Sequence, residues 1–220
     1  RIHATSQVPA KKTRFITYCQ RIAAILLLPV IIAIVALMMK KDHQEPLIAY
    51  NEVTAPYGMV SSLTLPDSSK VWLNAGSTLK YPTAFTSNVR EVEMSGEAYF
   101  EVHADKEHPF IVNTGDLKVT ATGTAFNICS FAKAQEEVIT LVTGKVAVSQ
   151  ENNIKHLLPG QQLNYQRASK SMEITDIDTY KYISWKDGIL AFRDDPLKSI
   201  FNRLEQVYQV RFILKDTSIN

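Results

Sequence analysis

The sequence predicts a mainly β protein: a single transmembrane helix, then an all-β domain, then a small, partial α+β unit. Three observations support this fold class. An uncharged apolar run lies at 22–39, short alternating segments separated by turn residues fill 49–178, and one helical apolar stripe lies near residue 200. With 45% hydrophobic and 21% charged residues, the composition is that of an ordinary folded protein, which excludes disorder as its main state.

The apolar run 22–39 is long enough to cross a membrane as a helix. It has the sequence IAAILLLPVIIAIVALMM, without a charged side chain. At 1.5 Å per residue it extends roughly 27 Å, close to the hydrocarbon thickness of about 30 Å. The following residues offer no A-x-A cleavage pattern, and Cys19 precedes the run instead of following it. We therefore expect an uncleaved anchor, neither a signal peptide nor a lipoprotein signal.

Pro29 lies inside this predicted anchor. Proline removes one helix hydrogen bond, which a membrane helix can tolerate as a kink. The functional alternative is local unwinding that helps an intramembrane protease to cut the helix near Pro29.

Charge is distributed unequally and predicts the orientation of the anchor. The first 41 residues hold seven of the 24 bases and none of the 22 acids, so the remainder has a net charge of −5. Five bases precede the run and two follow it, and positive charge favours the cytoplasmic side. We expect a cytoplasmic tail at 1–21, a linker at 40–48 and a periplasmic body, in a bacterial inner membrane. An acidic body also argues against binding to nucleic acid.

The segment 49–178 is predicted to be an all-β domain. Gly, Pro and Asn punctuate short alternating or β-branched runs, which is typical of a sandwich, barrel or solenoid, and periodicity does not choose among the three. In the strand at 97–103, alternate residues point to opposite faces. Ala98, Phe100 and Val102 share the expected core face, and Glu97, Tyr99, Glu101 and His103 share the expected solvent face.

The segment 179–220 has a different pattern. A strand-like run at 188–192 is followed by Asp195 and Pro196, a helix start with Asp as cap and Pro at the first helical position. An apolar stripe at helical spacing then predicts about three turns of helix, and 210–214 is predicted as another strand. This β-α-β piece is too small to bury its own face, so we expect a truncated domain, with further chain before Arg1 as well.

Motifs for catalysis or metal binding are not found in the sequence. The five histidines stand singly, and the best pair, His103 with His108, is better explained by a solvated loop. Glu97 and Glu101 could in principle do acid–base work, but charges on the wet face of a strand explain them better. We therefore predict a protein that is not an enzyme and has no cofactor or metal site.

Six blocks of sequence resemble the periplasmic domain of FecR-type anti-sigma factors, in family order over roughly 50–165. They are LTLPDSSKVWLNAGSTLKYP (63–82), REVEMSGEAYFEV (90–102), PFIV (109–112), GTAFNI (123–128), TLVTGKV (140–146) and LPGQQ (158–162). The family usually has Asp-Gly-Thr or Asp-Gly-Ser where this chain has Asp67-Ser68-Ser69, so this turn should either avoid positive φ or be strained. The resemblance implies a solenoid-like β domain, with a sandwich as the alternative.

The run WKDGILAF (185–192) and the helix after it resemble the small domain behind FecR, which is similar to the short N-terminal (STN) domain of secretins and TonB-dependent transducers. The resemblance implies an inner-membrane regulator without catalysis. An upstream cytosolic domain, absent here, would hold an extracytoplasmic-function (ECF) sigma factor. The periplasmic part would contact the signalling domain of an outer-membrane TonB-dependent transducer whose substrate is often an iron chelate or glycan.

Two surfaces are predicted for partner contacts. The first is the wet face of the C-terminal helix and the second is the strand after it, an edge that can accept another strand. The residues are Lys198, Asn202, Glu205 and Gln209, followed by Val210, Phe212 and Leu214. The alternative is that this strand pairs within its own domain.

A different function class also fits the sequence. A membrane-anchored glycan- or peptidoglycan-binding module would have the same anchor and β domain, with Trp72 or Tyr99 as a stacking platform. Exposure of these aromatic rings in a groove would favour this alternative, and their burial would disfavour it.

Overall fold

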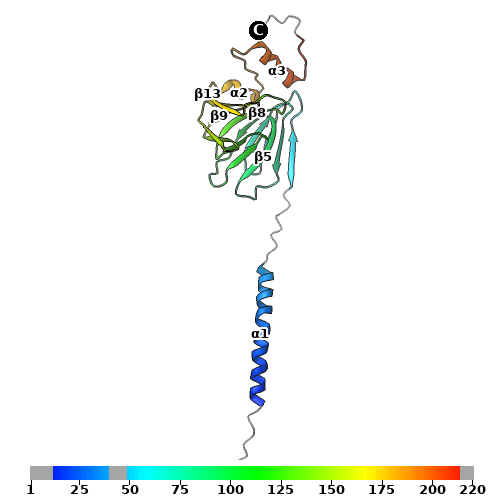
Figure 1. Ribbon diagram of the computed structural model, residues 1–220. Coiled ribbons are helices and arrows are strands. Elements are labelled where there is room, and N and C mark those ends of the chain that lie inside the picture. Colours follow the sequence, from blue (N-terminus) through cyan, green and yellow to red (C-terminus); the bar gives the residue numbers. More distant parts are fainter. Residues whose placement is uncertain (1–11, 40–48, 214–220) are drawn as a thin grey trace, which may run out of the picture. The chain divides into compact units, whose positions relative to one another are not determined.

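The computed structural model describes residues 12–39 and 49–213, which belong to two compact units (Figure 1). The first unit contains helix α1 (Lys12–Met39), with Pro29 inside it and no acidic residue in its first turn. The large apolar side chains of α1 whose exposure the structure describes are exposed, including Ile25 at 71% and Leu28 at 63%. In the part of the chain that the structure describes, no helix is identified as long and apolar enough to cross a membrane. The span at 22–39 therefore stays a prediction.

The second unit is built mainly of β-strands, as predicted. The strands are β1 (Tyr50–Thr54), β2 (Ser61–Thr64), β3 (Lys70–Leu73), β4 (Thr78–Pro82), β5 (Arg90–Glu101), β6 (Phe110–Asn113), β7 (Lys118–Ala121), β8 (Ala125–Ser130), β9 (Glu136–Thr143), β10 (Val146–Gln150), β11 (Asn153–Leu157), β12 (Gln161–Gln166) and β13 (Ser171–Asp176). Most are joined by short turns, which explains the regular punctuation of the sequence by Gly, Pro and Asn.

The long strand β5 organises the whole unit because it belongs to two sheets. Its first half pairs with β4 and, in parallel, with β6; its second half pairs with β3 and β8. The first sheet has the order β1-β4-β5-β6-β7-β10-β11, and the second has the order β2-β3-β5-β8-β9-β12-β13. Gly96 lies between the two halves at φ +106°, where a Cβ would approach the Cβ of Ser77 to 2.6 Å. Only glycine fits that position.

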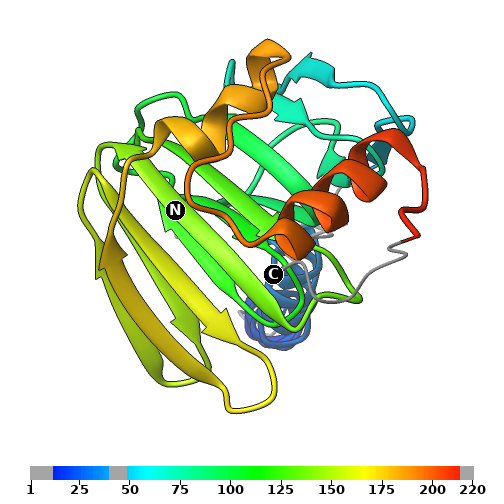
Figure 2. The same cartoon turned by 90° about the horizontal axis from the view of Figure 1, so that it is seen from above.

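The two sheets enclose one apolar core and form a nearly closed, barrel-like arrangement (Figure 2). Ala98 and Phe100 are fully buried and Val102 is 7% exposed, which confirms the predicted core face of β5. Phe100 stacks on Phe126 with ring centroids 5.2 Å apart. The solenoid-like arrangement that the resemblance implied is wrong. A solenoid stacks coils in parallel, whereas β5–β6 is the one parallel pair among the described strands.

Three short helical elements follow the strands: α2 (Tyr180–Ile183), the 3-10 turn η1 (Ser184–Asp187) and α3 (Leu197–Tyr208). The predicted helix is confirmed, although Pro196 is its N-cap, and the carboxylate of Asp195 binds Lys181 and the backbone N–H of Arg193. The predicted strand at 188–192 and the described part of the one at 210–214 are wrong. Apolar alternation is not sufficient for a strand, because its backbone also needs a pairing partner; none pairs with either run among the described residues.

Candidate functional site

The outer face of the second sheet is covered by the C-terminal segment, a name used here for residues 178–213. Figure 2 shows α3 and the α2–η1 turn on the same side of these strands. The prediction that Glu97 and Tyr99 face solvent is therefore wrong: Glu97 is 3% exposed and Tyr99 is 4% exposed. Alternation along β5 correctly separates its two faces, but it carries no information about a cover supplied by residues far along the chain.

A buried carboxylate, Glu97, connects the C-terminal segment to the sheet. Its Oε2 accepts a hydrogen bond from Asn74 Nδ2 at 2.7 Å, and its Oε1 accepts one from Asn127 Nδ2 at 3.1 Å. From α3, Arg203 Nη2 lies 3.4 Å from both carboxylate oxygens. From η1, Trp185 Nε1 donates to Asn127 Oδ1 at 3.2 Å. We call these five residues the Glu97 cluster.

Local structure fixes the sheet side of the Glu97 cluster. Asn74 begins the turn after β3, where its Oδ1 accepts the backbone N–H of Ala75 and its own N–H donates to the carbonyl of Glu97. The register of β5 with β8 places Tyr99 opposite Asn127 and Glu97 opposite Cys129. The acceptors for Arg203 and Trp185 are therefore fixed by the barrel and do not depend on the helices that use them.

An aromatic pair lies beside the Glu97 cluster. The rings of Trp72 and Tyr99 pack edge to face at 5.7 Å, and the ammonium of Lys186 lies 5.8 Å and 5.4 Å from their centroids. Burial, with the negative charges of Glu101 and Asp187, raises the pKa of Tyr99 to about 12, so its hydroxyl stays neutral. These rings already hold a cation of the same chain, which disfavours their use as a glycan-stacking platform.

Cys129 lies close to the contact between the C-terminal segment and the second sheet. It lies next to Glu97 on the outer face of β8 and is only partly exposed. Burial, and then the nearby carboxylate of Glu97, raises the pKa of its thiol. The thiolate, which is the reactive form, is therefore strongly disfavoured in this structure.

The residues predicted for partner contacts lie on and after α3, and no finding tests their role. Lys198 and Asn202 are exposed. Glu205 Oε1 accepts a hydrogen bond from the backbone N–H of Phe212 at 2.6 Å, which holds the chain after α3 against the helix. The Phe212 ring also stacks on Phe201 at 4.6 Å. Gln209 ends the helix at φ +54°.

The remaining predicted positions are less well defined by contacts. Val210 is 48% exposed, and Leu214 lies outside the described residues.

Sequence reasoning missed the loop between β1 and β2, where Tyr57 and Met59 are 57% and 61% exposed. A Cβ at Gly58 would lie 3.9 Å from the carbonyl oxygen of Val207, so this loop lies next to α3.

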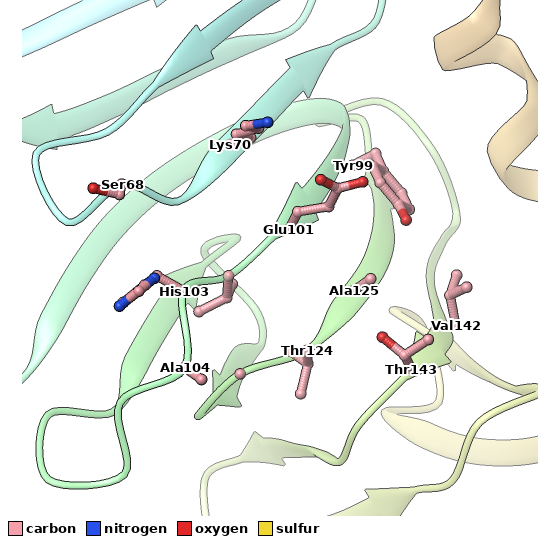
Figure 3. A pocket seen from close by; sticks show the side chains of 12 residues that line it. Ser68, Lys70, Tyr99, Glu101, His103, Ala104, Thr124, Ala125, Val142 and Thr143 are labelled. Carbon is pink, nitrogen blue, oxygen red and sulfur yellow. The ribbon is translucent and has the colours of Figure 1, made fainter.

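A cavity of about 560 Å³ opens where β5 ends (Figure 3). Lys70, Glu101 and His103 line it, and among the described residues no hydrogen bond joins these three side chains. His108 binds the carboxylate of Asp105 at 2.8 Å instead of facing a metal with His103. Within residues 12–39 and 49–213, no group of three or more potential metal ligands is present.

The turn before this cavity is held by a buried arginine. Arg90, 4% exposed, donates to Asp67 at 2.6 Å and to the carbonyl of His103 at 3.0 Å. Ser68, where the family usually has glycine, has φ +69°, so the turn keeps the positive φ and is strained. Arg90 was not singled out in the sequence because an arginine in a strand gives no sign of burial.

Comparison with known proteins supports one family. The profile of the family described as FecR protein matches residues 51–154. Two crystal structures of a candidate anti-sigma factor from Parabacteroides distasonis are each 35% identical to this chain with a TM-score of 0.69. The alignments cover 73% of this chain and 76% of that one, and 72% and 75%, respectively. No curated protein matches the chain. The match in sequence and fold shows that the chain belongs to the FecR-like anti-sigma factors.

Proposed function

We propose that this anti-sigma factor is a single-pass protein of the bacterial inner membrane that relays a periplasmic signal to a cytoplasmic ECF sigma factor. The observation that carries the proposal is the 35% identity with a candidate anti-sigma factor over 73% of the chain, a larger share than the FecR-matched residues 51–154. Members of this family are regulatory proteins, and we extend that role to this chain.

The membrane part of the proposal is supported by sequence. The run 22–39 is uncharged and lies within the 28-residue helix α1. The excess of basic residues before the run supports a cytoplasmic position for residues 1–21 and a periplasmic position for the barrel. Cys19 and Cys129 would then lie in different compartments.

The proposed partners are an ECF sigma factor, bound through chain upstream of Arg1, and the signalling domain of an outer-membrane TonB-dependent transducer. The exposed face of α3, with Lys198 and Asn202, supports a contact on the periplasmic side. We propose no catalysis: a partner that favours one periplasmic state shifts the population of a form that proteases recognise. Cleavage of α1 near Pro29 would then release the sigma factor, with an iron chelate or a glycan as inducer.

The partners are tested by cross-linking the full-length protein in its native host and identifying the products by mass spectrometry. We expect an ECF sigma factor and, in the presence of inducer, a TonB-dependent transducer. Lys198→Glu should weaken recovery of the transducer, while Lys133→Glu, an exposed charge reversal in the β8–β9 loop, should leave it unchanged. Recovery of neither partner class would contradict the proposed function.

The topology is tested with thiol labelling in whole cells. In a Lys155→Cys variant, whose new thiol lies on the exposed face of β11, a membrane-impermeant maleimide should react once the outer membrane is permeabilised. Cys19 should react only after the inner membrane is opened, so it serves as the internal control. If Cys19 were labelled before the cysteine at position 155, the chain would have the opposite orientation in the membrane.

The role of Pro29 is tested separately. In a Pro29→Leu variant, inducer-dependent processing of the protein should slow, because the helix regains one backbone hydrogen bond at the unwinding point. Processing at the wild-type rate, followed on an immunoblot, would remove Pro29 from the mechanism.

A further inference from the structure

The C-terminal segment is attached to the barrel by few interactions. Among the described residues, the backbone hydrogen bonds of 178–213 outside regular helices stay within that segment. Two side-chain links cross to the barrel, Trp185 to Asn127 and Arg203 to Glu97, together with the ammonium of Lys186 over Trp72 and Tyr99. Release of the segment would therefore break no backbone hydrogen bond between the described strands of the barrel.

Apart from Trp185, which is 2% exposed, the segment is also lightly packed. No residue of α3 whose side chain is described is buried, and Leu204 and Val207 keep intermediate exposure. The segment buries two residues, Ser184 and Trp185, and the Ser184 hydroxyl has no hydrogen-bond partner among the described residues. A buried hydroxyl without a partner destabilises the bound state, and water would satisfy it on release.

The central ion pair makes release less costly than the loss of packed apolar surface would be. Glu97 and Arg203 both lose hydration when the segment binds, and both regain it when the segment leaves. Removal of only one partner has a different effect, because the bound state then contains an uncompensated buried charge. We therefore expect the C-terminal segment to leave without unfolding of the barrel. The equilibrium between its bound and released states should depend strongly on Arg203.

We propose that the C-terminal segment is a displaceable latch, held on the second sheet by Arg203 in the Glu97 cluster. Its release uncovers a face that binds a guanidinium at Glu97, an indole N–H at Asn127 and an ammonium at the Trp72–Tyr99 pair. The occupant of that face is the chain's own segment 178–213, whose Arg203, Trp185 and Lys186 match these three positions. The latch is a property of the periplasmic unit and does not depend on the identity of any partner.

Cys129 supplies a native reporter for the latch. It lies opposite Glu97 in the sheet, close enough to Arg203 of the C-terminal segment for that charge to act on its thiol, and the chain contains one other cysteine, Cys19. In the full chain carrying Cys19→Ser, kept in detergent, a soluble disulfide reagent should modify Cys129 faster in the released state, because the thiol is only partly exposed in the bound state. At reagent concentrations where the rate is first order in reagent, the rate measures the released population.

The expected result is modification of wild-type Cys129 with a weaker urea dependence than global unfolding, because release exposes less surface than unfolding. Arg203→Met, which keeps the bulk over Cys129 but removes the charge, should accelerate modification by about ten- to hundredfold. Ser184→Ala, which removes the hydroxyl without a partner, should slow it by roughly two- to tenfold. Lys198→Met, an exposed change on the same helix, should leave the rate within about twofold.

Two results would overturn the proposal. The first is a urea dependence of Cys129 modification equal to that of global unfolding followed by circular dichroism, because the segment would then be a permanent part of the fold. The second is an Arg203→Met rate equal to that of Lys198→Met, because Arg203 would then not hold the segment.

Discussion

Replacing Arg90 with methionine should strongly destabilise the barrel. The guanidinium donates to four acceptors: Asp67 at 2.6 Å, and the carbonyls of His108, His103 and Asp105 at 2.8, 3.0 and 3.4 Å. Arg90 and Asp67 expose only 4% and 9% of their side chains, so neither has water to replace a lost partner. Removing one member of a buried ion pair costs about 3–5 kcal/mol because the other charge stays buried.

The loss should be visible as a lower free energy of unfolding at an unchanged urea dependence. Domains have about 5–15 kcal/mol of stability in total, so Arg90→Met removes a large share of it. Arg90→Lys should lose less, because it keeps the charge although one ammonium cannot replace the planar fork of donors. The measurement is urea unfolding followed by circular dichroism.

Lys80→Met is the matched control for this experiment. Lys80 also pairs with a carboxylate, Glu93, at 3.3 Å, but the two side chains are 42% and 60% exposed. An exposed pair contributes about 0–1 kcal/mol, so this variant should be nearly as stable as the wild type. If Arg90→Met lost no more stability than Lys80→Met, the argument from burial and unsatisfied acceptors would be refuted.

Three further predictions concern single positions. Ser68→Gly should raise the free energy of unfolding by about 0.5–1 kcal/mol, because glycine adopts φ +69° without strain, and a loss of stability in the same urea assay would contradict this. Burial raises the pKa of Glu137, although hydrogen bonds from Thr114, Ser130 and Arg167 oppose the rise. The folded state therefore holds this proton more tightly than the unfolded chain, and the stability that results is lost as pH rises from about 4.3 through the folded pKa. Glu137→Gln should accordingly gain stability relative to wild type between about pH 4 and pH 8, with Glu136→Gln as the exposed control, and a constant difference across that range would refute the shift. Trp185→Phe should destabilise docking of the C-terminal segment by about 1 kcal/mol, because Asn127 Oδ1 loses its donor, and an unchanged rate of Cys129 modification would count against that hydrogen bond.

Local sequence patterns predicted the faces of a strand and the position of a helix. Alternation identified Ala98, Phe100 and Val102 as a core face, and helical spacing identified α3. The distinction between solenoid and barrel depends on which distant strands pair, and periodicity does not specify that pairing. The runs 188–192 and 210–213 resemble strands, yet in the described structure neither has a strand beside it.

The candidate site was harder to predict than the fold. Glu97 and Tyr99 are on the face that alternation assigns to solvent, and they are buried under residues about ninety to a hundred positions away. A single polar residue on a strand gives no sign of such a cover. The Ser68 turn shows the opposite case: a departure from the family pattern correctly pointed to two outcomes, and the structure shows that strain is the one that occurs.

The double membership of β5 has a consequence for the proteolytic cleavage that we propose for this chain. A protease that nicks the exposed turn between β6 and β7 would sever the chain, but β8 would still pair with β5 in the second sheet and β7 would still pair with β6 in the first. The two fragments would stay together as one particle, much as the halves of a split protein reassemble. Within this unit, fragments can leave freely only from its two ends, where the chain joins β1 and where it follows β13.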